Sequence, residues 1–127
     1  MRILVVLLAA ALFAASPVEV LRGKLAGGAL VTADNKRVAL AGDADTKGVL
    51  NDKRLAGAEV ELRGRFTAPG VFTLDPIHTK AMHVHRQGKR FTVSYWCEVC
   101  AIRTYTPGQC WCCQEDTELD LQVPEKE

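Results

Sequence analysis

The sequence predicts a mostly β protein: a small antiparallel barrel or sandwich with one short helix and a cysteine-rich C-terminal segment. Three observations predict it. Charged and uncharged residues alternate over several short stretches, turn residues separate these stretches, and all five cysteines lie between positions 97 and 113. The chain has 127 residues, of which 48% are hydrophobic and 24% charged. This ordinary globular composition excludes collagen-like, coiled-coil and fully disordered classes, and the length allows one small domain.

The N-terminus has the pattern of a secretory signal peptide. Arg2 is followed by residues 3–15, which carry no charge, and the small residues Ala14, Ala15 and Ser16 lie at the end of this run. A helix that spans a bilayer needs roughly 20 apolar residues, so this run is too short. We expect residues 1–16 to be a signal peptide, and the mature chain to be exported to the periplasm or outside the cell without a transmembrane segment. The alternatives are a buried N-terminal helix and an uncleaved membrane anchor.

The middle of the chain predicts short strands. Residues 59–66 alternate charged and uncharged positions, which places Val60, Leu62 and Phe66 on one face of a half-buried strand. Residues 37–40 repeat this pattern more briefly. Glycine, proline and Asn/Asp favour the backbone geometry of turns. They predict a break at Gly27-Gly28 and turns at Asp34-Asn35, Ala68-Pro69-Gly70 and Gln87-Gly88.

One helix and one late strand complete the predicted elements. Residues 45–55 place Val49 and Leu50 at near-helical spacing, with Thr46 as the expected N-cap. Residues 118–123 alternate acidic or polar side chains with apolar ones, which predicts a further strand beside the cysteines.

The layout of residues 17–95 resembles an OB-type barrel, with five or six strands and one short helical connection. Such barrels often bind oligonucleotides or oligosaccharides, although a fold does not fix a function. We therefore expect an OB-like barrel over residues 17–95, a cysteine-rich segment over 96–123 packed on it, and a frayed tail over 124–127.

The cysteines form two pairs with the same spacing. Cys97 and Cys100 make one C-x2-C step, and Cys110 and Cys113 make another nine residues later. Each step can aim two sulfurs at one point, and residues 106–108 (Thr-Pro-Gly) supply the chain reversal between them. Four thiolates around one centre make a tetrahedral cage suited to zinc, with iron or copper as alternatives.

This spacing resembles a zinc-ribbon or rubredoxin-like knuckle pair. The resemblance implies a closed, structural site with Cys97, Cys100, Cys110 and Cys113 as ligands. Cys112 is an alternative fourth ligand. Such knuckles often have glycine after the second cysteine, where this chain has Ala101 and Gln114.

Disulfides are the competing interpretation, because paired cysteines usually oxidise in an exported protein. Five is an odd number, and a bridge between the adjacent Cys112 and Cys113 would be strained. A redox-active pair at Cys97 and Cys100 is the third alternative. The sequence leaves all three open.

The three histidines suggest a second site. His83 and His85 lie two apart on a predicted strand, so their rings leave the same face, and His78 precedes them. Together they are candidate ligands for zinc, copper or nickel. The alternative is a basic surface for an anionic ligand or an acidic protein partner. Its candidate residues are Lys80, His83, His85, Arg86 and Arg90.

The tryptophans and the charge balance bear on function. Trp96 and Trp111 each neighbour a cysteine, and we expect them to shield the sulfurs; a stacking platform for a sugar or base is the alternative. Residues 17–113 hold fourteen Lys/Arg and nine Asp/Glu, whereas residues 114–127 hold one Lys and six acids. A nucleic-acid-binding protein usually has a larger basic excess.

The sequence lacks the common enzyme signatures: no Gly-rich phosphate loop, H-E-x-x-H helix or G-x-S-x-G elbow is present. We expect an exported metal-binding β-domain that acts as a binding or structural module. The alternatives are a thiol–disulfide or metal-transfer protein of the cell envelope, and an OB-type module that binds its ligand on the basic surface.

Overall fold

The computed structural model describes residues 17–124. The predicted signal peptide (residues 1–16) and the last three residues of the predicted tail (125–127) lie outside the described residues. Within residues 17–124, no helix combines the length and the apolar character needed to cross a membrane.

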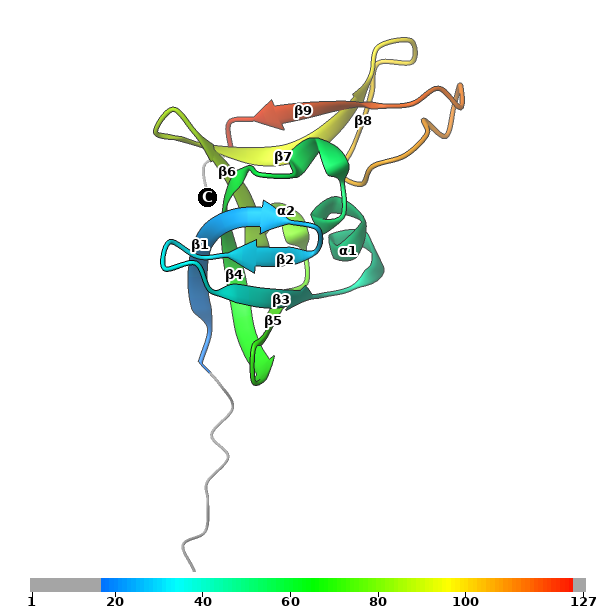
Figure 1. Ribbon diagram of the computed structural model, residues 1–127. Helices are drawn as coiled ribbons and strands as arrows, with labels where there is room; N and C mark the ends of the chain where they lie inside the picture. The colour runs from blue at the N-terminus through cyan, green and yellow to red at the C-terminus, as the bar shows by residue number, and fades with distance from the viewer. Residues whose placement is uncertain (1–16, 125–127) are drawn as a thin grey trace, which may run out of the picture.

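The first five strands form a closed barrel, which confirms the predicted fold class (Figure 1). They are β1 (Glu19–Ala26), β2 (Ala29–Val31), β3 (Arg37–Ala41), β4 (Glu59–Ala68) and β5 (Val71–Leu74). The ring runs β1-β2-β3-β5-β4, and pairing of β4 with β1 closes it. Only β3 and β5 are parallel; the other pairs are antiparallel. This strand order is the one expected for an OB-type barrel.

The alternation along β4 produces the inner face of the barrel. Val60 and Leu62 are fully buried, and Phe66 packs edge-on against Phe72 with ring centroids 5.3 Å apart. Gly64 occupies an inward position where a Cβ atom would overlap the carbonyl oxygen of Thr73. Glycine at this position therefore allows β4 and β5 to approach closely where the barrel closes.

The predicted turns are confirmed, because each contains the positive φ angles that glycine and asparagine tolerate. The break between β1 and β2 has φ of 53° at Gly27 and 79° at Gly28. Asn35 (66°), Gly70 (72°) and Gly88 (74°) mark the other three turns.

The helices differ from the prediction in two respects. The first helix, α1 (Ala44–Leu50), begins after Asp43, whose carboxylate accepts the backbone N–H of Thr46 at 2.8 Å. The predicted Thr46 N-cap is therefore wrong: Thr46 lies in the first turn and its side chain is buried. A 3-10 turn, η1 (Lys53–Leu55), follows. A second helix of one turn, α2 (His78–Ala81), was not predicted, because its four residues are too few for a periodic pattern.

Four more strands extend the sheet beyond the barrel: β6 (Met82–Arg86), β7 (Lys89–Cys97), β8 (Ile102–Thr104) and β9 (Glu118–Gln122). Strand β4 pairs with β1 along one edge, and with β6 and then β5 along the other. In the same way β7 pairs with β6 and β8 along one edge and with β9 along the other. The predicted strand over 118–123 is thereby confirmed. Figure 1 shows β7, β8 and β9 together at one end of the molecule.

One hydrophobic cluster joins the barrel to the added strands. It runs from Leu30 and Leu62 inside the barrel through Val84 of β6 to Val93 and Tyr95 of β7. The last strand of the closed ring along the chain is β5. Residues 75–95, which were predicted to belong to the barrel, instead form α2, β6 and most of β7 beside the ring. The cysteine-bearing end of β7 is therefore fixed to a continuous core.

Candidate metal centre

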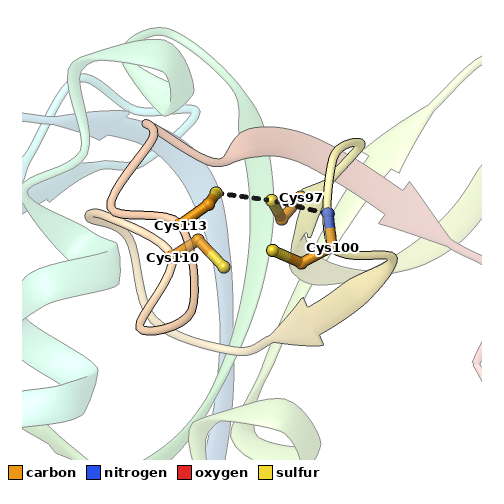
Figure 2. A group of neighbouring side chains, drawn as sticks. All are labelled: Cys97, Cys100, Cys110 and Cys113. Atoms are coloured by element: carbon orange, nitrogen blue, oxygen red, sulfur yellow. Dashed lines mark hydrogen bonds between the residues drawn. The ribbon is translucent and has the colours of Figure 1, made fainter.

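The structure brings the sulfurs of Cys97, Cys100, Cys110 and Cys113 together. All four Sγ atoms lie within 4.8 Å of one another, and those of Cys97 and Cys113 are 3.5 Å apart. Figure 2 shows the four side chains pointing toward a common centre from two facing turns. Ligands of a tetrahedral ion with metal–sulfur bonds of about 2.3 Å are roughly 3.8 Å apart. The four sulfurs are thus arranged as ligands of one ion would be, and the group could hold a metal.

The first turn presents its sulfurs through backbone hydrogen bonds. Cys97, at the end of β7, is 2% exposed, and its Sγ accepts the backbone N–H of Cys100 at 3.4 Å. The backbone N–H of Val99 also favours the ionised form of this sulfur. The chain then leaves the turn through Ala101, which has a φ of 52°.

The second turn repeats this arrangement. Cys110 is 1% exposed, and the backbone N–H groups of Cys113 and Cys112 favour the ionised form of its sulfur. The chain leaves through Gln114, which has a φ of 62° and donates its N–H to the carbonyl of Cys110 at 2.8 Å. Ala101 and Gln114 therefore adopt the left-handed conformation for which glycine is preferred. In both turns the residue after the second cysteine has a positive φ, and in neither turn is that residue glycine.

The sulfurs differ in how readily they ionise. Backbone N–H groups of Cys113 and Cys112 lower the pKa of Cys110 to about 7. The N–H of Cys100 lowers the pKa of Cys97, but burial and the neighbouring thiols outweigh it and raise that pKa above the usual range. The Cys112 thiol, burial and the thiols of Cys113 and Cys110 raise the pKa of Cys100 strongly. A cation at the centre would reverse these last two shifts, because it stabilises adjacent thiolates.

Cys112 lies outside the group of four sulfurs. Its residue is exposed, whereas Cys97 and Cys110 are buried and Cys100 and Cys113 are half-buried. Its backbone N–H contributes to the second turn, and its thiol is close enough to Cys100 to affect that residue's pKa.

A short hairpin supports the second turn. Gln109 and Asp116 form an isolated bridge, and Cys110 donates its backbone N–H to the carbonyl of Glu115 at 2.8 Å. Thr117, which is buried, donates both its backbone N–H (3.1 Å) and its hydroxyl (2.8 Å) to the carbonyl of Gly108. These contacts fix where the chain enters and leaves the turn.

A polar network attaches this hairpin to the barrel. Arg54 donates to the carbonyl of Thr117 at 2.8 Å and forms an ion pair with Asp52 at 3.0 Å. Tyr95 donates its hydroxyl to the same carboxylate at 2.7 Å, and its ring lies 5.1 Å from the guanidinium. Burial opposes ionisation of Asp52, but hydrogen bonds from Arg54 and Tyr95 outweigh it and lower the pKa of this carboxyl. This network was not predicted, because Tyr95 and Thr117 lie far from Asp52 and Arg54 in the chain.

The histidines have separate partners. His78, in α2, donates through Nε2 to the carbonyl of Tyr105 at 2.6 Å, and so ties α2 to the loop after β8. His85 contacts Glu61 of β4 at 3.2 Å, and Arg90 donates to Nδ1 of His83 at 3.0 Å. Between residues 17 and 124, the three imidazoles do not form a group that could hold an ion, whereas the four cysteines do. A metal site at the histidines stays a prediction.

The predicted basic surface is divided. Lys80, His83 and Arg90 line one pocket, whereas His85 and Arg86 do not. Glu61 belongs to this region and was missed. The alternation along β4 predicts that Glu61 lies on the outer face. Its position opposite His83 depends on the pairing of β4 with β6, which the sequence does not show.

The two tryptophans differ in exposure. Trp111 is 75% exposed, so for this residue the prediction is wrong. Trp96 is half-buried; its indole N–H donates to Glu98 at 2.9 Å, and the guanidinium of Arg103 lies 4.9 Å from its ring.

Comparisons of the chain with protein-family models, with curated proteins and with solved structures found no match.

Proposed function

We propose that the protein is an exported β-domain whose C-terminal segment folds around one zinc ion bound by Cys97, Cys100, Cys110 and Cys113. The observation that carries this proposal is the equivalence of the two turns. In each turn two backbone N–H groups favour the ionised form of the first sulfur, and a residue with positive φ follows the second cysteine. Two such turns facing each other provide four sulfurs for one ion.

Zinc is the ion favoured among those that bind four thiolates. Iron and copper(I) also accept soft sulfur ligands. Zinc has no redox chemistry, so it is the ion best suited to an exported site in an oxidising compartment.

The role of the ion is structural. Along the segment from residue 98 to 117 only Cys110 and Thr117 are buried, so side-chain packing stabilises this segment little. Metal binding then supplies the free energy that orders it. Four protein ligands leave no open coordination position for a substrate. We therefore assign the protein to binding or structural modules rather than to enzymes.

Cobalt(II) titration of the full processed chain tests this proposal, because cobalt(II) can replace zinc and its absorption reports thiolate ligands. We expect one equivalent to bind and to produce an intense thiolate-to-metal band. Serine at any of the four ligand positions, for example Cys110→Ser, should reduce the band and weaken binding. Cys112→Ser is the matched control and should leave both unchanged. Equal losses in the Cys112 variant and the ligand variants would contradict the assignment.

The exposed thiol of Cys112 supports a second candidate function, metal transfer in the cell envelope. Metal passes between proteins through ligand exchange, and an accessible thiol beside a closed site can begin that exchange. Zinc release to a competing dithiol chelator distinguishes the two functions. A transfer protein should release zinc about ten-fold more slowly after Cys112→Ser, since a reactive thiol is lost. A structural site should show the same release rate in both proteins.

A further inference from the structure

A pocket of about 280 Å³ lies between the barrel and α2, and none of the cysteines lines it. Strands β1, β4, β6 and β7, the loop after β5 and α2 all contribute to it. Its charged and polar side chains are Glu61, Arg63, Asp75, Lys80, His83 and Arg90. This volume is just below the range of about 300–1,000 Å³ that is typical of small-molecule sites.

The acidic side chains in the pocket are already paired. Glu61 contacts Arg90 at 3.1 Å through one oxygen and His85 at 3.2 Å through the other. Asp75 lies 3.6 Å from Arg63. Lys80 is the remaining cation, and it makes no ion pair within 4.0 Å among residues 17–124. The lining therefore carries a positive charge that no acidic side chain balances.

The guanidinium of Arg90 is held in place before any ligand binds. Its NH2 group contacts both Glu61 and His83. An arginine can only donate, so Nδ1 of His83 is the acceptor and the ring proton is on Nε2. A guanidinium has five N–H donors on three nitrogens, and both contacts of Arg90 use the same terminal nitrogen. The N–H groups on the other two nitrogens remain to bind an anion.

The wall of the pocket also has an apolar part. Val20 of β1, which is 58% exposed, and Ala81 of α2, which is buried, both line it. An anion with a short apolar end would cover Val20 and gain from its burial. The carboxylates of Glu61 and Asp75 disfavour a doubly charged anion, because like charges at close range repel.

We propose that this pocket binds a small organic monocarboxylate. Lys80 and Arg90 meet the carboxylate, and Val20 and Ala81 contact its apolar remainder. This binding is separate from the cysteine site, so either proposal can fail without the other.

The test is an NMR titration of the full processed chain, loaded with zinc, with sodium propionate at constant ionic strength. We expect saturable shifts of the backbone amides of residues 80–83 and 90. Lys80→Gln should weaken binding about four-fold, as expected for one exposed charge contact. Lys89→Gln removes the same charge from the exposed end of β7 and should leave the affinity unchanged.

Three results would overturn the proposal. They are shifts that do not saturate, equal weakening in the Lys80 and Lys89 variants, and tighter binding of inorganic phosphate to the same residues. Both lysines are exposed, so neither substitution disturbs the core. Thermal unfolding of the two variants provides the check that they are folded.

Discussion

The thiol of Cys110 is the group prepared to bind a cation first. Its pKa of about 7 leaves it partly ionised at neutral pH, whereas the raised pKa values of Cys97 and Cys100 keep those thiols protonated. A metal must therefore displace protons from the site. The affinity for the metal is linked to pH through those protons.

We expect zinc binding at pH 7 to release about two or more protons, because Cys97 and Cys100 must both ionise. The affinity should fall steeply as the pH falls. Calorimetry in buffers of different ionisation enthalpy measures the proton release. An affinity independent of pH between about 6 and 8, with no proton release, would contradict thiolate ligation.

The carboxylate of Asp52 links the barrel to the cysteine hairpin, and its pKa is lowered in the folded protein. Its contribution to stability is therefore present above the ordinary value of 3.8, and is lost as the pH falls through the lower folded value. We expect Asp52→Asn to reduce the free energy of unfolding at pH 7 by about 1–3 kcal/mol, because Tyr95 and Arg54 lose a charged acceptor.

Urea unfolding at pH 7 and pH 3 measures this effect. The difference between wild type and the Asp52 variant should shrink at the lower pH. Asp45→Asn is the matched control: its exposed carboxylate in the first turn of α1 is worth less than about 0.5 kcal/mol. Equal losses at the two positions would show that the network does not stabilise the fold.

At the scale of elements, the two cysteine turns could be predicted because their information is local. Spacing alone identified Cys97, Cys100 and Cys110 as a group, with Cys113 or Cys112 as the fourth member. The break at Gly27-Gly28 was predictable for the same reason, because the ability of glycine to adopt a positive φ does not depend on the rest of the fold. The start of α1 was not: both Asp43 and Thr46 can cap a helix, and the tertiary burial of Thr46 decided between them.

The positive φ of Ala101 gives a test of the turn geometry. We expect Ala101→Gly to stabilise the zinc-loaded protein by about 1 kcal/mol, because a left-handed alanine is strained and glycine is not. Ala56→Gly is the control: this exposed alanine has a φ of −60°, so glycine there adds only unfolded-state freedom and should destabilise. Urea unfolding measures both. A loss of stability in the Ala101 variant would contradict the turn described here.

At the scale of the whole molecule, the sequence predicted the fold class but not the contacts between distant segments. The alternation along β4 showed which residues face the core, and Val60 and Leu62 are there. It could not show that Glu61 meets His85, or that Arg54 reaches Thr117, because those contacts follow from strand register and from docking. The sequence likewise could not show that the three histidines have separate partners.

The close approach of β4 and β5 at Gly64 can be tested by a substitution. A Cβ atom on Gly64 would overlap the carbonyl oxygen of Thr73 and lie 2.8 Å from Cα of Leu74, both backbone atoms that cannot move aside. We expect Gly64→Ala to cost about 3 kcal/mol or more in the free energy of unfolding.

Gly48→Ala provides the contrast for this prediction. Its Cβ atom would meet Pro107 at 3.7 Å, an ordinary contact, and alanine favours the helix by about 1 kcal/mol. Thermal unfolding should therefore place the melting temperature of the Gly48 variant above wild type and that of the Gly64 variant well below it. A Gly64 variant as stable as wild type would contradict the described pairing of β4 and β5.

Native mass spectrometry of the protein purified from its own compartment, with and without a chelator, shows directly whether the cysteines bind zinc. We expect one zinc ion per chain, a mass that shows all five cysteines reduced, and loss of the ion on chelation. A chain without metal, lighter by the hydrogens lost in two disulfides among the same cysteines, would contradict it.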